Sequence, residues 1–401
     1  MHLSHTVTCP IHRSFRVEQV AGMFDLPLGE KATQRFDVEL PDRDERWEIG
    51  LIVGPSGSGK STIARQAFDN ELYQGSDWPA DRAVIDCFGD LPVRQVVELL
   101  TAVGFSSPPS WVKPYAVLSN GERFRCDLAR ALARGEERGA RSESRGEERG
   151  SRSECKETSS SPLAPHHSPL VVFDEYTSVV DRNVARVASA AIAKGIRAGR
   201  IPYRFVAVTC HYDVAEWLEP DWTLDMATCS LSRRRLRRPS IELEIHRCRV
   251  AAWQMFARHH YLSGEIHTQA RCYLATWNGV PVSFAATLPL VGRRNHRRFT
   301  RIVTLPDYQG IGIGMRVVAA VAGLHREEGL RVNVTSSHPA LIQHCKRSPL
   351  WKAIAVKKPG ARPRSNGRFR NYRDSGGRGV VSFEYVGKRA IGCRLSAIGQ
   401  N

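Results

Sequence analysis

The most informative stretch of the chain reads Leu118-Ser-Asn-Gly-Glu-Arg-Phe-Arg-Cys-Asp-Leu-Ala-Arg-Ala-Leu132. A glycine-rich loop ending in Lys60-Ser61 precedes it, and the apolar run Leu170–Phe173, which leads into Asp174-Glu175, follows it. Because Ser119 is a favourable helix N-cap, the stretch predicts a helix whose amino end can receive an anion. These elements in this order indicate that the first half of the chain handles a nucleoside triphosphate.

The glycine-rich loop follows the short buried run Leu51–Val53 and fits the pattern G-x-x-x-x-G-K-[ST]. Its glycines let backbone N–H groups close around a phosphate, while Lys60 reaches the β- and γ-phosphate oxygens and Ser61 offers its hydroxyl to Mg²⁺. At the end of the later strand, Asp174 is expected to hold Mg²⁺ through water, and Glu175 to polarise the attacking water. The predicted phosphate-binding residues of the loop are Gly54, Pro55, Ser56, Gly57, Ser58, Gly59, Lys60, Ser61 and Thr62.

Residues 15–228 resemble the ATPase domain of ATP-binding cassette (ABC) proteins. The resemblance rests on the loop at 54–61, on Leu118-Ser-Asn-Gly-Glu122 as signature, on Asp174-Glu-Tyr-Thr-Ser-Val-Val-Asp181 as Walker B and D-loop, and on Val208-Thr-Cys-His211 as the switch strand. It implies a homodimer in which Ser119 and Gly121 contact the γ-phosphate held by Lys60 of the second copy. It also implies that Asp181 lies across the dimer interface and that His211 senses the γ-phosphate.

The chain departs from the cassette pattern in two places. No glutamine ends the expected strand Ala83–Cys87, where Asp90 or Gln95 could substitute, and the helical segment 89–118 is short. Both departures favour a cassette that works on nucleic acids or macromolecular complexes, with the ATPase subunit of a transporter as a less favoured alternative. Phe24 is the candidate for stacking on the adenine base, with a core phenylalanine as the alternative.

The rest of the chain predicts a second domain. Residues 15–53 are expected to form an antiparallel lead-in sheet, and the repetitive, charged segment 134–168 a disordered insertion. We expect an ATPase domain at 1–230, a basic linker at 231–240, and a second domain at 241–401 whose segment 357–378 is mobile. The fold class is therefore α/β, an ABC-type P-loop ATPase domain followed by an α+β domain.

Charge is divided unevenly between the halves of the chain, which carries +17 overall. Residues 1–230 hold 27 Lys and Arg against 33 Asp and Glu, a net charge of −6, and residues 231–401 hold 31 against 8, a net charge of +23. A basic half suits a polyanionic partner such as nucleic acid, although a generic basic surface would look the same.

Ten cysteines without a Cys-x-x-Cys pair indicate reduced thiols in a cytoplasmic protein. No apolar run is long enough to span a membrane, so no membrane partner is expected.

The second domain carries its own glycine-rich turn, Gln309-Gly-Ile-Gly-Ile-Gly314, between a strand and a helix. Such a turn can wrap backbone amides around a pyrophosphate at a helix N-terminus. Its setting, over roughly 240–355, resembles GNAT-type acyltransferases and is loosely similar to the phage Mom-type enzymes that modify adenine in DNA. The resemblance implies acetyl-CoA, or another acyl-CoA, bound by residues of the strand and the turn: Val303, Gln309, Gly310, Ile311, Gly312, Ile313 and Gly314.

The catalytic groups of this domain are less defined. His259, His260 and Tyr261 follow the first helix of the domain and could supply a base and a substrate contact, or they could simply end that helix. Ser336-Ser337-His338 follow a later strand, where a proton donor to the leaving thiol could lie. The basic runs 233–238, 293–298 and 357–373, interleaved with Phe299, Phe369 and Tyr372, could neutralise phosphates.

The leading hypothesis is an ATP-hydrolysing cassette fused to an acetyl-CoA-dependent acyltransferase that modifies nucleic acid. The alternative is a soluble cassette whose C-terminal half is a non-catalytic module that binds nucleic acid or protein.

Overall fold

The computed structural model describes residues 1–29, 31–134, 169–260, 265–359 and 379–387. Most of the predicted insertion at 134–168 and of the segment 357–378 lies outside these residues, as does Tyr261. The chain divides into two compact units, and each is described by itself. Unit 1 holds residues 1–75, the described residues of 134–178, and 202–238, whereas unit 2 holds residues 76–133, 179–201 and the described residues from 239 onwards.

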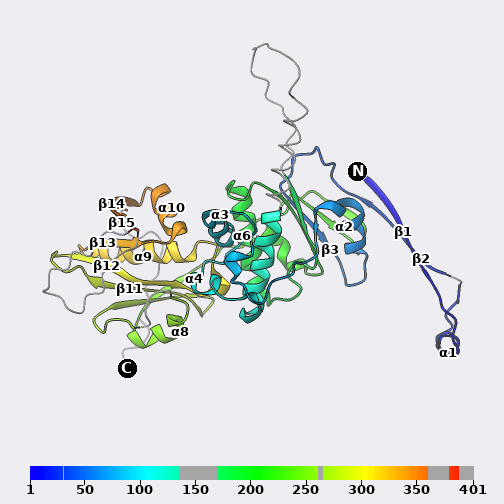
Figure 1. The fold of residues 1–401 in the computed structure, drawn as a ribbon, viewed down its shortest axis with the longest axis horizontal. Helices are drawn as coiled ribbons and strands as arrows, with labels where there is room; N and C mark the ends of the chain where they lie inside the picture. The colour runs from blue at the N-terminus through cyan, green and yellow to red at the C-terminus, as the bar shows by residue number, and fades with distance from the viewer. Residues whose placement is uncertain (30, 135–168, 261–264, 360–378, 388–401) are drawn as a thin grey trace, which may run out of the picture. The chain divides into compact units, whose positions relative to one another are not determined.

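Unit 1 is built on a six-stranded sheet whose first five strands are parallel (Figure 1). The strand order is β4 (Leu72–Tyr73), β5 (Leu170–Phe173), β6 (Arg204–Thr209), β3 (Ile49–Val53), β7 (Trp222–Asp225) and the antiparallel edge strand β8 (Ser230–Ser232). Continuous apolar runs such as β3 and β5 are typical of parallel strands covered on both faces. The sequence predicted β3, β5 and β6 correctly.

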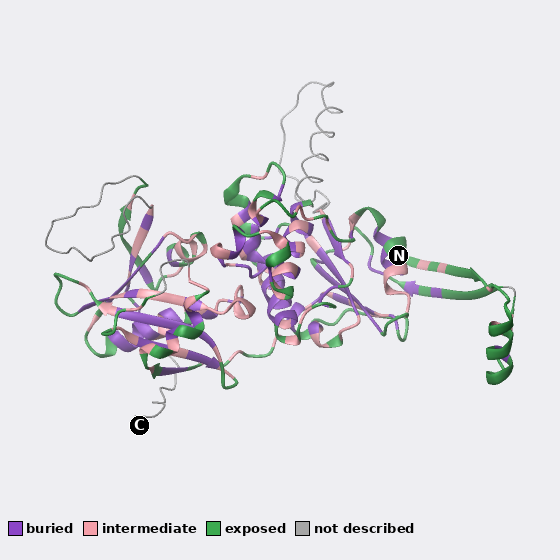
Figure 2. Cartoon of the chain, turned by 60° about the horizontal axis from the view of Figure 1, so that its bottom comes forward, coloured by how far each residue is buried: buried purple, intermediate pink, exposed green. Residues whose placement is uncertain are grey.

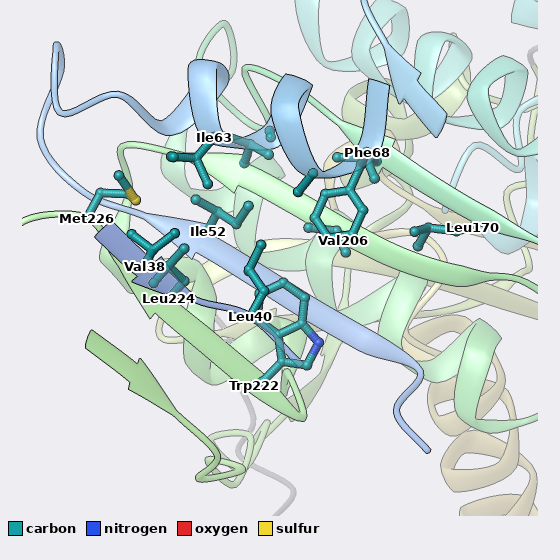
Figure 3. Packing of buried hydrophobic residues seen from close by; sticks show 14 of the residues in the cluster. Val38, Leu40, Ile52, Ile63, Phe68, Leu170, Val206, Trp222, Leu224 and Met226 are labelled. Atoms are coloured by element: carbon teal, nitrogen blue, oxygen red, sulfur yellow. The ribbon is translucent and has the colours of Figure 1, made fainter. Parts of the chain in front are cut away.

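Helix α2 (Lys60–Phe68) packs one face of this sheet and closes the core of unit 1. Figure 3 shows Ile63 and Phe68 of α2 facing Ile52 and Val206 of the sheet. Unit 1 also contains the short 3-10 helices η1 (Asp69–Glu71) and η4 (Tyr212–Val214) and the short α-helix α7 (Ala215–Leu218).

Gly50 lies in β3 beneath the indole ring of Trp222, and a Cβ atom there would approach Trp222 Cζ2 to 2.1 Å. Because Trp222 is fully buried and cannot move away, Gly50→Ala is expected to lower the free energy of unfolding of unit 1 by at least ~2 kcal/mol. Urea unfolding followed by tryptophan fluorescence measures this. The control is Gly22→Ala, in a helix with open space around it, which should be neutral or slightly stabilising; equal stability of the two variants would contradict the packing described.

The N-terminal ribbon of unit 1 differs from the prediction. Strands β1 (His2–Pro10) and β2 (Lys31–Glu39) pair in antiparallel fashion, and helix α1 (Phe15–Phe24) lies between them, so the expected strand at the start of 15–53 is wrong. Ser14 caps α1 by accepting a hydrogen bond from the Val17 N–H, and Asp25 ends it in the left-handed region. The helix lies at the far end of the ribbon from α2 and is mostly exposed (Figures 1 and 2). Phe24 is 67% exposed there, so it is not a core phenylalanine.

Unit 2 begins with a helical segment. It comprises η2 (Val84–Asp86), α3 (Val93–Ala102), α4 (Pro108–Trp111), η3 (Tyr115–Val117), a helix at 120–134 and α6 (Arg182–Arg197). The expected strand Ala83–Cys87 is wrong, because this stretch forms η2 with a single bridge from Ala83 to Pro114. Proline has no N–H to extend a ladder, so the pairing stops there.

The remainder of unit 2 is a seven-stranded sheet with the order β14-β15-β13-β12-β11-β10-β9 (Figure 1). The sequence pattern predicts strands at 241–247, 270–277, 281–288, 300–305, 331–336 and 379–385 and helices at 250–258 and 314–328, which the structure confirms approximately, whereas α10 and β14 were not predicted. Strands β12 and β13 are parallel and pair only from His296↔Arg331 to Arg298↔Asn333, after which they separate. The elements are β9 (Glu244–Cys248), η5 (Val250–Trp253), α8 (Gln254–Ala257), β10 (Arg271–Trp277), β11 (Val280–Pro289), β12 (His296–Thr304), η6 (Pro306–Tyr308), α9 (Ile313–Glu327), β13 (Arg331–Ser336), α10 (Pro339–Arg347), β14 (Trp351–Lys357) and β15 (Val380–Tyr385).

None of the helices in the described ranges is long and apolar enough to cross a membrane.

Candidate functional sites

The loop between β3 and α2 has the backbone geometry of a phosphate cradle. Gly57 and Gly59 adopt φ values of +80° and +85°, which side-chain-bearing residues rarely adopt. A Cβ atom on Gly59 would also approach the ring of Phe36 to 2.5 Å. Lys60 Nζ donates to the Pro55 carbonyl at 2.7 Å, so the ammonium is held over its own loop. The sequence therefore identified a loop whose shape depends on its glycines.

The amide groups of this loop are available to an anion. Ser58 N–H donates to the Pro55 carbonyl at 3.3 Å, whereas the N–H groups of Ser56, Gly57 and residues 59–62 donate to no acceptor within the described ranges. They surround the N-terminus of α2, whose dipole adds positive potential. Residues 54–62 thus fit a polyphosphate.

Asp174 lies beside the loop, as the prediction of a Mg²⁺ site requires. Its Oδ1 accepts from the Ser61 hydroxyl at 3.0 Å and from the Glu175 N–H at 2.9 Å. The hydroxyl and carboxylate oxygens that would hold Mg²⁺ are therefore adjacent, and both are ligands of the kind that Mg²⁺ prefers.

Glu175 begins a tight turn after β5. It adopts φ +52°, Thr177 adopts φ +66°, and Glu175 Oε2 accepts from the Ser178 hydroxyl at 2.7 Å. Left-handed backbone at two residues without glycine is uncommon and is typical of functional turns. His211 follows β6, two residues beyond Thr209, which pairs with Val53 immediately before the loop. His211 and the loop therefore extend from the same edge of the sheet.

In unit 2, the signature stretch forms a capping box. Ser119 and Glu122 bond reciprocally: the Glu122 N–H donates to Ser119 Oγ at 3.4 Å, and the Ser119 N–H donates to Glu122 Oε2 at 3.0 Å. Burial opposes ionisation of Glu122, but hydrogen bonds from Ser119 and from the Ser110 hydroxyl outweigh it and hold the pKa of this carboxyl below its usual value. The predicted helix N-terminus is confirmed.

Asp181 caps α6, accepting from the N–H groups of Asn183 and Val184 at 2.9 and 3.0 Å. Asp181 was predicted only to lie across a dimer interface, and its role as this cap was missed.

The turn between β12 and α9 is the second cradle. Gly310 and Gly312 adopt φ values of +90° and +96°, and the N–H groups of residues 310–315 donate to no acceptor within the described ranges. They precede or open α9, so the macrodipole of this helix reinforces them. A Cβ atom on Gly314 would approach Thr304 Oγ1 to 2.8 Å, which shows that α9 packs tightly on β12. The turn fits a pyrophosphate, and acyl-CoA binding at these residues stays a prediction.

Val303 lies in β12 next to this turn and is buried. Its carbonyl accepts from the Ser283 hydroxyl at 2.9 Å. A bulge at Thr300, where the β11–β12 register shifts, was not predicted, because single-residue insertions in a ladder leave no pattern in the sequence.

Two candidate catalytic histidines of unit 2, His259 and His260, follow α8, whereas the third, His338, precedes α10. The imidazole of His260 packs edge-to-face on Trp253 at 5.6 Å, and His259 Nε2 accepts from Arg258 Nε at 3.0 Å. Burial, assisted by Arg258, lowers the pKa of His259, which keeps this imidazole neutral. His338 is the residue immediately before α10, where its side chain makes no capping hydrogen bond, and burial lowers its pKa also. Among the described residues, no hydrogen bond joins His338 to either of the other two.

The basic runs are only partly available to a polyanion. Arg297 is buried and donates to the Thr287 carbonyl at 2.9 Å, and Phe299 is buried too. Arg233 and Arg238 form ion pairs with Glu45 and Glu219. The exposed arginines of the two described runs are Arg233, Arg234, Arg235, Arg237, Arg293 and Arg294, and of these Arg233 is held by its ion pair with Glu45.

A buried polar network that the sequence did not predict joins α9 to strands β11 and β12. Thr287 Oγ1 lies 3.0 Å from His325 Nε2 and accepts from Arg297 Nε at 3.1 Å. Burial lowers the pKa of His325 to about 4, so its imidazole is neutral, and the network supports the sheet rather than a reaction.

Comparison with known proteins places part of the chain in a family. Residues 234–343 match the model of the Acetyltransferase (GNAT) family. This segment is a GNAT acetyltransferase domain. It contains β12 and β13, which pair over a short stretch and then separate, and the glycine turn at 309–314. A comparison with the curated proteins finds no match.

Solved structures of both kinds are similar to parts of the chain. The ribosomal-protein-S18-alanine N-acetyltransferase of Escherichia coli is 14% identical over 40% of this chain and 98% of its own, with a TM-score of 0.28. A dimeric bacterial ABC transporter cassette is 15% identical over 48% of this chain and 87% of its own, with a TM-score of 0.32. An ATP-bound bacterial Atm1-family ABC exporter is 15% identical over 49% of this chain, with a TM-score of 0.31, and the chain spans only 34% of that exporter.

Proposed function

We propose that the chain is an ATP-hydrolysing ABC-type cassette joined to an acyl-CoA-dependent N-acyltransferase. One observation carries the proposal: the chain contains two separate glycine turns, each with left-handed glycines and unbonded N–H groups at the start of a helix. The first turn is accompanied by Lys60 and by the Ser61–Asp174 pair, which suit a nucleoside triphosphate with Mg²⁺. The second lies in the segment that matches the GNAT family.

In the cassette, Ser61 and Asp174 would hold Mg²⁺ and Glu175 would orient the attacking water. The signature segment, with Ser119 and Gly121 at a helix N-terminus, supports a homodimer in which each copy completes the site of the other. His211 would then sense the γ-phosphate.

In the acyltransferase, residues 310–315 would hold the pyrophosphate of acyl-CoA, and bound acyl-CoA would supply an activated acyl group as a thioester. His259 and His260 are the candidates for the base among the described residues, because both follow α8 within the segment that matches the GNAT family and an unprotonated imidazole can take a proton from an acceptor amine.

We propose nucleic acid as the acceptor because of the basic second half and the exposed Arg293 and Arg294 at the β11–β12 turn. Arg293→Glu combined with Arg294→Glu is expected to weaken binding of a duplex DNA or single-stranded RNA probe about tenfold or more, and to reduce the slope of log affinity against log salt by about 2. Fluorescence anisotropy from low to high salt measures both quantities.

The control exchanges exposed arginines elsewhere, Arg16→Glu with Arg94→Glu, and should leave the salt slope unchanged. Absence of binding to either probe at low salt would remove nucleic acid as the acceptor.

Mass spectrometry of nucleosides from cells with and without the protein tests the whole proposal. An acylated nucleoside that depends on the protein supports it. If no such nucleoside is present and acetyl-CoA does not bind the purified protein, the second half is a binding module instead.

A further inference from the structure

The proposed acyl-CoA turn is contacted by residues that precede it by more than a hundred positions in the sequence. Within unit 2, α6 packs against η6, and α3 packs against α10. Figure 1 shows α3, α4 and α6 close to one another. The turn is therefore contacted both by its own domain and by the helical segment of the cassette.

Lys194 of α6 fixes one peptide plane of the turn. Its Nζ donates to the carbonyl of Ile311 at 3.1 Å and lies 2.8 Å from the position of a Cβ atom on Gly312. In a trans peptide the carbonyl and the next N–H point in opposite directions. Holding the Ile311 carbonyl toward Lys194 therefore directs the Gly312 N–H to the other side, away from the lysine and available to an anion.

The side chain of Gln309 is hydrogen-bonded both to the helical segment of unit 2 and to its seven-stranded sheet. Its Oε1 accepts from the Ser106 N–H at 2.7 Å, and its Nε2 donates to the Thr304 carbonyl at 2.9 Å. The first bond reaches the helical segment and the second reaches β12. The start of the turn is thereby fixed from both sides.

The backbone of Gly104, in the helical segment, packs directly against the backbone of Gly310, in the glycine turn. A Cβ atom on Gly104 would approach the Gln309 carbonyl oxygen to 2.9 Å, and one on Gly310 would approach Gly104 Cα to 2.7 Å. Both residues have positive φ values, +86° and +90°. Only glycine fits at either position.

The signature helix lies against the same region. The guanidinium of Arg125 is fully buried and has no hydrogen-bond partner among the described residues, and its nearest carboxylate is that of Asp307, with 3.8 Å between NH1 and Oδ1. A Cβ atom on Gly121 would lie 3.5 Å from the same Oδ1. Asp307 precedes Gln309 by two residues, so a shift of the signature helix would act on the turn directly.

We propose that the acyl-CoA site is composite: Lys194, Ser106 and Gly104 of the cassette's helical segment are positioning residues that hold the turn 309–314 in its anion-binding shape. The inference rests on the proposed acyl-CoA function. It makes acyl-CoA affinity a property of both halves of the chain, and it gives the signature helix a route to change that affinity.

The test measures CoA binding to the full chain by calorimetry. Gly104→Ala places a methyl group against the Gln309 carbonyl, and Gly199→Ala is the matched control, because Gly199 also follows a helix with positive φ, +63°, but faces open space. Gly104→Ala is expected to weaken CoA binding about tenfold or more, whereas the control retains affinity.

Lys194→Met provides a second variant in case Gly104→Ala does not fold, with Lys194→Arg as the conservative exchange and the exposed Lys346→Met as control. Lys194→Met is expected to weaken CoA about tenfold, and Lys194→Arg to restore most of the affinity. Dephospho-CoA, which keeps the pyrophosphate, should show the same loss, and pantetheine, which lacks it, should show none.

The outcomes separate the two claims. If the unaltered chain does not bind CoA, the proposed acyl-CoA function fails. If it binds CoA and both Gly104→Ala and Lys194→Met bind as tightly, the composite site fails while the function stands. An equal loss of pantetheine affinity in Lys194→Met would likewise overturn the role assigned to the pyrophosphate turn.

Discussion

Glu175→Gln is expected to bind ATP but to hydrolyse it roughly 100-fold or more slowly, and to accumulate as an ATP-bound dimer. The substitution keeps the shape of the side chain and its hydrogen bond from Ser178 while removing the negative charge that polarises water. Because the phosphate loop and Ser61–Asp174 are untouched, ATP affinity should be retained. Steady-state phosphate release and light scattering with and without Mg-ATP measure the two effects.

The matched control is Glu216→Gln, an exposed glutamate on α7 of the same unit, which should hydrolyse ATP as the unaltered chain does. Unchanged turnover in Glu175→Gln would mean that the turn after β5 does not orient the attacking water.

Gly312→Asp is expected to weaken acetyl-CoA binding at least about 100-fold, because a carboxylate placed within the turn repels the pyrophosphate and the residue must adopt φ +96°. ATP binding at the loop 54–62 should be unchanged, so this one substitution distinguishes the acetyl-CoA site from the ATP site. Calorimetry with each ligand in turn measures this.

The control is Gly329→Asp, which has a similar φ of +76° and open space but lies at the end of α9, away from the turn. If Gly312→Asp and Gly329→Asp bind acetyl-CoA equally well, the turn at 309–314 is not the acyl-CoA site.

The glycine turns could be predicted from the sequence because their backbone conformation depends only on adjacent residues. A left-handed glycine followed by a helix needs only a few adjacent residues, and the structure places Gly57, Gly59, Gly310 and Gly312 in that conformation. The capping box at Ser119 and Glu122 was likewise readable from a spacing of three residues.

Helix α1 and the burial of Arg297 and Phe299 were not predicted, because they depend on how distant segments pack. Helix α1 has exposed apolar residues, including Phe15 at 81%, so its pattern suggests a strand or a core although Ser14 marks a helix start. Arg297 and Phe299 have the composition of a polyanion-binding run, yet the ladder with β11 turns them inward. Burial within a sheet is set by register, which charge patterning does not show.

The contact of Lys194 with Ile311 joins residues 117 positions apart. No local spacing or periodicity encodes such a pair, and it could be found only in the structure.

The most direct test of the account is calorimetric titration of acetyl-CoA into Glu175→Gln chain already saturated with Mg-ATP. Two separate cradles predict one acetyl-CoA bound per chain with ATP still in place, and loss of that binding in Gly312→Asp. Displacement of ATP by acetyl-CoA, or no acetyl-CoA binding to the folded chain, would contradict the central claim.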